Sequence, residues 1–158
     1  MTTVPFLWFD TQAEEAAQLY TSVFPNSSIT SVARYGPAGP GPEGTVMTVE
    51  FSLDGQTFVA LNGGPEFAFT EAVSFQIPCA DQVEVDHYWS SLSAGGEEGP
   101  CGWLKDRFGL SWQVVPAVLP ELLGDPDPGR AQRAMQAMLG MGKLSIAELQ
   151  AAADAVPA

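Results

Sequence analysis

The sequence predicts an α+β fold in which two βαβββ modules form a curved mixed sheet around a cleft, followed by C-terminal helices. The chain has 158 residues, of which 46% are hydrophobic, and this suits one domain with a true core. A strand–helix–strand pattern returns in the second half, and helical periodicity resumes afterwards. We therefore expect a single domain over 1–158, with module 1 at about 1–66, module 2 at about 70–116 and C-terminal helices at 117–158.

Module 1 begins with a short apolar strand at 4–9. Residues 10–24 have apolar side chains at helical spacing, Asp10 or Thr11 could cap that helix, and a Pro-Asn pair ends it. Further strands are predicted at 28–35, 45–53 and 56–62, the last two joined by an Asp-Gly hairpin turn. Between them, the proline- and glycine-rich segment 36–44 predicts a mobile loop.

Module 2 repeats this pattern. A strand at 73–78 and a helix at 79–92 overlay the first strand and helix when the sequence is shifted by 69 residues, so that Phe6 falls on Phe75 and Tyr20 on Trp89. The last strand, 110–115, overlays 56–61 with a shift of 54. The second module therefore lacks about fifteen residues, and the repeat indicates a duplicated βαβββ unit.

Two helices are predicted after the repeats. Residues 128–139 carry Met135, Met138 and Leu139 on one stripe, and residues 145–155 begin with Ser145 and Glu148 at capping-box spacing. Their apolar faces need cover, which could come from their own sheet or from a second subunit.

Charge and cysteine content exclude several classes of protein. Six basic residues face nineteen acidic ones, and the net charge of -13 argues against binding to nucleic acid or to an anionic membrane surface. The apolar start is too short for a signal peptide, and no apolar run is long enough for a membrane span. We expect a cytoplasmic protein whose two cysteines, Cys79 and Cys101, are free thiols.

Strand alternation predicts which side chains line the cleft. In each strand the apolar set is assigned to the helix and the other set to the cleft, with the register of module 2 carried over to module 1. The expected ligand-binding residues are Leu7, Phe9, Thr48, Glu50, Val59, Leu61, Ser74, Gln76, Ser111 and Gln113. One wall would be apolar and the other would carry amides and hydroxyls, which suits a small, partly apolar ligand held by neutral hydrogen bonds.

Glu50 is the candidate catalytic residue. A carboxylate on a cleft wall loses solvent and can serve as a general base. The alternative is a solvent-exposed carboxylate at the sheet edge, or one paired with Arg34 or Lys105.

The stretch CGWLKDRFGLSWQVVP, residues 101–116, concentrates functional residue types. Its segment 105–109 predicts a hairpin turn whose charges are solvated or cross-bridged, and Trp112 is expected in the core. Cys101 lies beside two glycines and could approach a ligand, but no histidine is placed to activate it, which favours a buried structural cysteine. The roles of Cys101 and Trp103 stay open.

Four motifs resemble the PhnB-like branch of the vicinal oxygen chelate superfamily, which includes glyoxalase I, bleomycin-resistance proteins and extradiol dioxygenases. They are LWFD (7–10) with EEAAQLY (14–20), FVALNGGPEFAF (58–69), CGWLKDRFGLSWQVVP (101–116) and AMLGMGKLSIAEL (137–149). The resemblance implies paired βαβββ modules around a small-molecule site, and a homodimer. This branch is often labelled 3-demethylubiquinone-9 3-methyltransferase-like. The glycines at 62–67 precede a proline rather than a helix, so they predict a turn and not a methyl-donor site.

The resemblance also indicates where the ligands of a metal ion would lie. Metal-dependent members place His, Gln or Glu on the first and last strands of both modules, and these positions fall near Pro5, Val59, Ser74 and Gln113. A stable divalent site needs about three good donors, which this set does not supply. The single histidine, His87, is expected at an exposed or capping position. We therefore expect no metal and no cofactor.

The predicted function is small-molecule binding without a metal, with the ligand and any reaction unknown. The first alternative is a metal-dependent lyase, isomerase or dioxygenase of the same superfamily. The second is a non-catalytic structural or interaction dimer.

Overall fold

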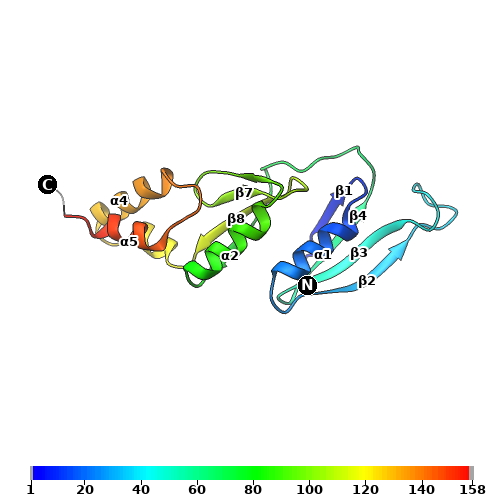
Figure 1. The fold of residues 1–158 in the computed structure, drawn as a ribbon, viewed down its shortest axis with the longest axis horizontal. Helices are drawn as coiled ribbons and strands as arrows, with labels where there is room; N and C mark the ends of the chain where they lie inside the picture. Colours follow the sequence, from blue (N-terminus) through cyan, green and yellow to red (C-terminus); the bar gives the residue numbers. More distant parts are fainter. Residues whose placement is uncertain (1, 157–158) are drawn as a thin grey trace. The chain divides into compact units, whose positions relative to one another are not determined.

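Two four-stranded mixed sheets, one in each half of the chain, carry the architecture of this computed structural model, which describes residues 2–156 (Figure 1). The chain divides into unit 1, residues 1–69, and unit 2, residues 70–158. Each unit follows the order strand, helix, three strands. The predicted α+β class with two βαβββ modules and C-terminal helices is therefore confirmed. The strands form two separate sheets, and no hydrogen-bonded strand pair joins them. The predicted cleft between the modules therefore stays a prediction.

Unit 1 has its sheet in the order β1-β4-β3-β2, with β1 parallel to β4 and the other neighbours antiparallel. Its elements are β1 (Phe6–Phe9), α1 (Ala13–Val23), β2 (Ser28–Arg34), β3 (Val46–Leu53) and β4 (Gln56–Asn62). The predicted hairpin between β3 and β4 is present: both Asp54 and Gly55 have positive φ angles, as a tight two-residue turn requires.

Unit 2 repeats this order in its sheet, β5-β8-β7-β6, again with the first and last strands parallel. Its elements are β5 (Ser74–Cys79), α2 (Gln82–Ser93), β6 (Glu97–Glu98), β7 (Trp103–Lys105), β8 (Ser111–Pro116), α3 (Leu119–Leu123), α4 (Pro128–Leu139) and α5 (Ile146–Asp154). The shortening predicted from the repeat falls in β6, in β7 and in the segment between them. None of the helices described is long and apolar enough to cross a membrane.

Helix α1 begins at a side chain that the sequence pattern did not indicate. Neither Asp10 nor Thr11 caps it, because the N-cap residue is Gln12 and its side chain makes no cap hydrogen bond. Instead, Asn62 at the end of β4 accepts a hydrogen bond at its Oδ1 from the Ala13 backbone N–H, at 2.8 Å. The cap comes from the neighbouring strand, which fixes the start of α1 against the sheet.

The glycine- and proline-rich segment 36–44 is irregular, as predicted, and is anchored to Tyr35. The Tyr35 N–H donates to the Thr45 carbonyl, and the Gly44 N–H donates back to the Tyr35 carbonyl. A Cβ atom added at Gly41 would lie 2.4 Å from the Tyr35 ring, so this close approach requires glycine. The ring is buried, and the loop folds around it.

Asp106 lies in the turn between β7 and β8. The sequence predicted a solvated or cross-bridged side chain here, but Asp106 is buried. Only 2% of it is exposed. Its carboxylate accepts hydrogen bonds from the Phe108 and Leu110 backbone N–H groups and, at 2.9 Å, from the Trp112 indole Nε1. The turn is therefore held from inside by one charged acceptor, and Trp112 lies in the core as predicted.

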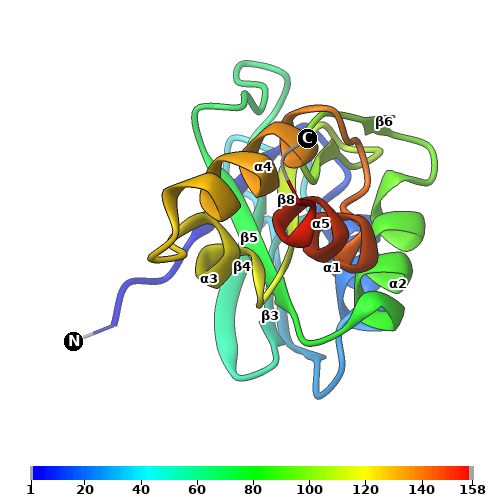
Figure 2. The same cartoon turned by 90° about the vertical axis from the view of Figure 1, so that its left-hand side faces the viewer.

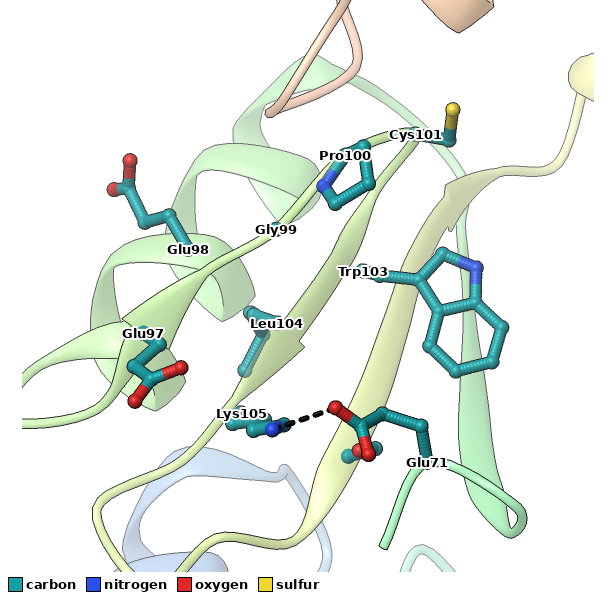
Figure 3. Close-up of a pocket in the computed structure, with 10 residues that line it drawn as sticks. Glu71, Glu97, Glu98, Gly99, Pro100, Cys101, Trp103, Leu104 and Lys105 are labelled. Carbon is teal, nitrogen blue, oxygen red and sulfur yellow. Dashed lines mark ion pairs between the residues drawn. The ribbon is translucent and has the colours of Figure 1, made fainter.

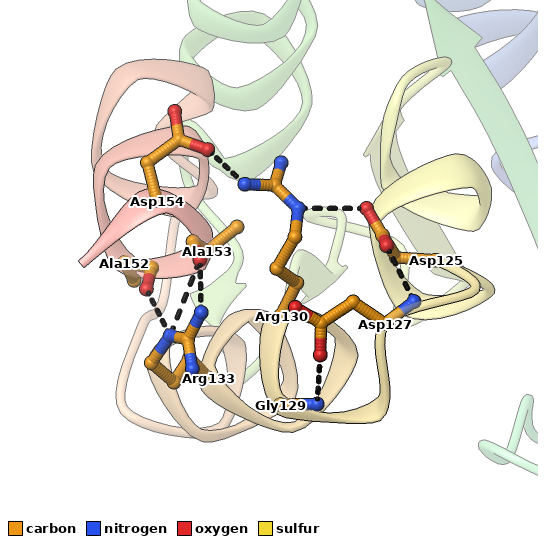
Figure 4. A network of polar contacts seen from close by, with 8 residues as sticks. All are labelled: Asp125, Asp127, Gly129, Arg130, Arg133, Ala152, Ala153 and Asp154. Atoms are coloured by element: carbon orange, nitrogen blue, oxygen red, sulfur yellow. Dashed lines mark hydrogen bonds and ion pairs between the residues drawn. The ribbon is translucent and has the colours of Figure 1, made fainter. Parts of the chain in front are cut away.

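The C-terminal helices pack within unit 2. Helices α3, α4 and α5 gather together (Figure 2) and enclose a small core with Val115 of β8, Leu144 and Leu149. Polar contacts fasten α4 to its neighbours (Figure 4): Arg130 pairs with Asp125 and Asp154, and Arg133 donates to the last carbonyl groups of α5. Their own unit thus covers part of the predicted stripe: Met138 packs against this core, whereas Met135 and Leu139 stay exposed. Ser145 caps α5 as predicted.

We predict that Asp106→Ala destabilises the protein by about 2–4 kcal/mol, because it leaves buried N–H donors without an acceptor. Urea unfolding followed by tryptophan fluorescence measures this change. Asp106→Asn, which keeps one acceptor oxygen, should lose less, and Glu43→Ala in the exposed loop of unit 1 should change stability by less than about 0.5 kcal/mol. Equal effects of the two Asp106 variants would contradict the role assigned to its carboxylate.

Candidate functional site

The face of the unit 2 sheet that points away from α2 gathers polar side chains. Strand pairing places Ser74 beside Ser111, Gln76 beside Gln113, and Lys105 beside Ser111. Cross-strand partners share a face. The alternate residues of β5 and β8, such as Ile77 and Val114, are buried under α2. The structure therefore brings all four residues predicted in unit 2 onto one face, together with Lys105 and Trp103.

The corresponding face of unit 1 differs from its prediction in β1. Thr48, Glu50, Val59 and Leu61 share the face opposite α1, as the strand patterns predict. Leu7 and Phe9 do not join them. They pair with Ala60 and Asn62, lie on the face covered by α1, and are 5% and 3% exposed. The assignment of Leu7 and Phe9 to the ligand side is wrong, and Phe6 and Trp8 take those positions.

A one-residue difference in the connection between strand and helix explains the error. The last strands overlay with a shift of 54, so Val59 of unit 1 corresponds to Gln113 of unit 2. Phe6 pairs with Val59 and Gln76 pairs with Gln113, so the first strands overlay with a shift of 70, not 69. The helices keep the shift of 69, because α1 starts four residues after β1 ends, and α2 starts three residues after β5 ends. Sliding a strand by one residue exchanges its two faces.

A pocket of about 400 Å³ opens on this face of unit 2, toward β6 and β7 (Figure 3). Pro100 and Cys101 lie at one end, an ion pair between Lys105 and Glu71 lies at the other, and the Trp103 indole borders one side. Strand alternation placed Ser111 on the ligand side, left the roles of Cys101 and Trp103 open, and did not indicate Glu71. Glu71 precedes β5, outside any regular element, so strand alternation could not find it.

Ser111 contributes the exceptional polar group of this pocket. Its side chain is 1% exposed, and among residues 2–156 its Oγ is a buried polar atom without any hydrogen-bond partner. Leaving a buried hydroxyl unpaired costs about 1–3 kcal/mol. Native proteins pair nearly all such groups, so the missing bond of this hydroxyl could be supplied by an ordered water or by a ligand atom.

The ion pair at the end of the pocket joins β7 to the segment before β5. Lys105 Nζ lies 2.6 Å from Glu71 Oε1. The hydrogen bond from Lys105 lowers the pKa of Glu71, and Glu71 in turn raises the pKa of Lys105. Both directions favour the charged pair at neutral pH. A carboxylate with a lowered pKa stabilises the folded protein at pH values above its ordinary pKa. This stabilisation is lost as the pH falls and Glu71 becomes protonated.

The positions that the resemblance assigns to metal ligands hold neutral or apolar groups. Pro5 and Val59 cannot ligate a metal, and neither can Phe6, which β1 presents beside Val59 on the ligand-side face. In unit 2, Gln113 Nε2 donates to Ser74 Oγ at 2.8 Å, so these two side chains are hydrogen-bonded to each other. No group of three or more His, Cys, Asp and Glu side chains in the described chain could hold a metal ion. The residues present do not fit the divalent site of metal-dependent relatives.

Glu50 lies on the ligand-side face of unit 1 but is exposed to solvent. Its Oε1 accepts a hydrogen bond from Thr30 Oγ1 at 2.9 Å. The alternative partners are engaged elsewhere: Arg34 donates to the Gly44 carbonyl, and Lys105 pairs with Glu71. The burial on which the general-base hypothesis depended is missing, so we assign Glu50 no catalytic role.

The two cysteines occupy different environments. Cys79 is buried, and burial together with the nearby Glu84 carboxylate raises the pKa of its thiol to about 11. Cys101 is half-buried at the pocket and has a φ angle of +57°, a left-handed conformation that is uncommon outside glycine. Its backbone N–H donates to the Met141 carbonyl at 2.7 Å, which ties the turn before β7 to the C-terminal segment. Both thiols are free.

A second pocket, of about 470 Å³, lies in unit 1 near the start of α1. Its central polar side chains already serve the fold: Asn62 caps α1 and donates to the Val46 carbonyl, and Tyr35 donates to the Asn62 carbonyl. The unit 2 pocket, with its unpaired Ser111, is therefore the stronger candidate site.

Comparisons with known proteins agree with this architecture. A sequence model of the family described as 3-demethylubiquinone-9 3-methyltransferase matches residues 1–115. A structure described as a putative 3-demethylubiquinone-9 3-methyltransferase, PhnB protein, from Bacillus cereus is 36% identical, with a TM-score of 0.66 over 74% of this chain and 100% of that chain. A search of curated proteins found no match.

More distant structures share the fold alone. Protein PA1353 from Pseudomonas aeruginosa is 19% identical, with a TM-score of 0.62 over 73% of this chain and 97% of that chain. The fosfomycin resistance protein FosX from Listeria monocytogenes, in complex with Mn(II) and sulfate, is 17% identical, with a TM-score of 0.52 over 78% of this chain and 95% of that chain.

The paired βαβββ units and the likeness to the PhnB structure place this chain in the vicinal oxygen chelate class of proteins. Within that class, this chain belongs to the PhnB-like family described as 3-demethylubiquinone-9 3-methyltransferase. The family description does not establish a reaction. In this chain the segment after β4 leads through turns to β5 without a helix, so it lacks the glycine-rich strand-to-helix turn over which a methyl donor usually binds.

We predict that a thiol reagent such as dithionitrobenzoate modifies one cysteine rapidly in the folded protein at pH 8. With a pKa of about 11, Cys79 would be roughly one part in a thousand thiolate at that pH, and it is buried. Cys101→Ser should abolish the rapid phase, whereas Cys79→Ala should retain it. Unfolding in guanidinium should expose the second thiol. A rapid phase that persists in Cys101→Ser would contradict this assignment.

Proposed function

We propose that this protein binds a small, partly apolar organic molecule on the helix-free face of unit 2, without a metal. The unpaired buried hydroxyl of Ser111 is the observation that carries the proposal, because a ligand atom can satisfy it. The Trp103 indole offers an apolar surface at the same pocket, and the Ser74–Gln113 pair adds neutral hydrogen-bonding groups nearby on this face. Such a mixture is typical of sites for small molecules.

Further parts of the proposal follow from the family and from charge. We take residues 1–158 as one domain, with the ligand-side residues Thr48, Glu50, Val59 and Leu61 of unit 1 also available to a ligand. The superfamily resemblance supports a homodimer. The net charge of -13 argues against binding to nucleic acid. The two free cysteines support the cytoplasmic location that we propose.

The proposal of metal-free binding rests on the donor set. FosX is described in complex with Mn(II), but this chain has Pro5 and Val59 near two of the positions where the resemblance places metal ligands, and the neighbouring Phe6 cannot ligate either. The amide and hydroxyl at the other two positions are neutral, and they bind each other. Two weak donors fall short of the three that a stable divalent site needs.

A library of small aromatic amides tests the ligand site. We expect some members to bind at millimolar concentration and to shift the Trp103 indole N–H resonance in ¹H–¹⁵N spectra, with Trp103→Ala used for its assignment. Ser111→Ala should weaken binding about threefold to tenfold, because one hydrogen bond is lost. Leu139→Ala, an exposed change on α4, should leave affinity unchanged. Binding that is insensitive to Ser111→Ala would place the site elsewhere.

Native mass spectrometry tests the metal proposal on protein purified without chelator or metal-affinity resin. We expect the mass of two chains without bound metal, and no rise in melting temperature when Mn(II), Zn(II) or Ni(II) is added in excess. Ligand binding raises the melting temperature of the state it binds, so a real site would appear as a concentration-dependent increase. Stoichiometric metal in the purified protein would overturn the proposal.

A further inference from the structure

We propose that Lys105 and Ser111 form a subsite for a carboxylate group of the ligand, and that Glu71 occupies this subsite while the protein is free. The inference rests on the proposed function and names the chemical class of the ligand. It predicts an organic acid with one carboxylate and an apolar or aromatic body. Glu71 is then an internal competitor that the ligand displaces from Lys105.

Two hydrogen-bond donors meet at this end of the pocket. Lys105 and Ser111 are cross-strand partners on β7 and β8, so their side chains leave the same face side by side. A lysine ammonium can only donate hydrogen bonds, and the Ser111 hydroxyl has no partner in the structure described. A carboxylate is an acceptor with two oxygens, so one group can accept from both side chains.

The structure already contains a carboxylate bound to Lys105. Glu71 reaches Lys105 from the segment before β5, and both residues line the same pocket as Ser111. The Glu71 side chain is 59% exposed, so it can return to water when displaced. The exchange replaces one carboxylate on Lys105 by another, and exposed ion pairs of this kind hold their partners weakly. In addition, the ligand gains the bond to Ser111 that Glu71 does not make.

A cationic ligand group fits this position less well, despite the acidic composition of the chain. Lys105 would repel an ammonium group at contact distance, whereas most of the nineteen acidic residues act through solvent and salt. Glu97 is the cross-strand partner of Lys105 and is exposed. Glu98 accepts a hydrogen bond from the Trp89 indole at 2.9 Å. The nearest cation therefore decides the class of ligand group.

The rest of the pocket fits the body of such an acid. The Trp103 indole and Pro100 give apolar surface beside the subsite, and a volume of about 400 Å³ accommodates a molecule built on one aromatic ring. Benzoate is therefore a suitable probe. Benzamide, which has nearly the same shape, is its neutral counterpart, and benzylamine is a cationic counterpart.

The experiment compares dissociation constants of these three probes, from the Trp103 indole resonance at one pH and ionic strength. For the wild-type protein we expect benzoate to bind in the millimolar range, and more tightly than either counterpart. Glu71→Gln should tighten benzoate binding about twofold to fivefold by removing the competitor. Lys105→Met should weaken it by about tenfold or more, and Ser111→Ala by about threefold to tenfold.

Lys143→Met provides a matched control, because Lys143 forms a comparable ion pair with Asp86 at 2.7 Å and neither residue lines the pocket. It should leave the affinity for benzoate unchanged. Melting temperatures of all variants separate loss of binding from loss of folding. If Glu71→Gln lowers the melting temperature without changing benzoate affinity, the ion pair is structural and the inference is overturned.

Two results distinguish this inference from the proposed function. Saturable binding of benzamide or benzylamine that equals or exceeds that of benzoate would overturn the carboxylate subsite and leave the small-molecule site standing. Absence of saturable shifts with all three probes and with the aromatic amide library would overturn both.

Discussion

The parallel pairing between the first and last strands of each unit is the constraint on which the rest of the structure depends. It sets β1 against β4 and β5 against β8, and a connection that returns to a parallel strand needs a crossover. The helix and the two antiparallel strands supply that crossover. Because the helix covers one face, the register of this single pair decides which side chains stay free to meet a ligand. In unit 2 that register places Ser74 beside Ser111, and Gln76 beside Gln113.

The sequence predicts what local patterns encode and misses what a distant contact decides. Apolar alternation, the Asp54-Gly55 turn and the Ser145 cap are local features, and the structure has them nearly where they are expected. The faces of β1 depend on its partner β4, and four apolar or aromatic residues in succession give no alternation to read. The repeat offered a register, but one additional residue between β1 and α1 reversed it. A shift that fits the helices need not fit the strands.

Charged and polar groups inside unit 2 show the same limit. Asp106 stands between Lys105 and Arg107 and has the local signature of a solvated turn, yet its carboxylate is buried against the Trp112 indole. Ser111 was assigned to the ligand side, but nothing in its neighbourhood along the chain shows that its hydroxyl lacks a partner. Glu71 meets Lys105 from a segment without regular structure. These contacts depend on how the backbone brings distant residues together. The alternation of side chains along a strand indicates only which face of the sheet a residue occupies.

Comparing the two duplicated units shows why the residues of the proposed site gather on unit 2. When Val59 is aligned with Gln113, the strand registers make Ser52 equivalent to Lys105, Thr57 to Ser111 and Glu50 to Trp103. Unit 1 thus presents a carboxylate and hydroxyls where unit 2 presents an indole and a cation. Its single basic residue, Arg34, donates to the Gly44 carbonyl. The two units share one backbone plan, but unit 2 alone places an ammonium group beside an unpaired hydroxyl on that face. Under the proposed function, selection between classes of ligand would therefore reside in a few substitutions on a common framework, and the fold by itself does not determine it.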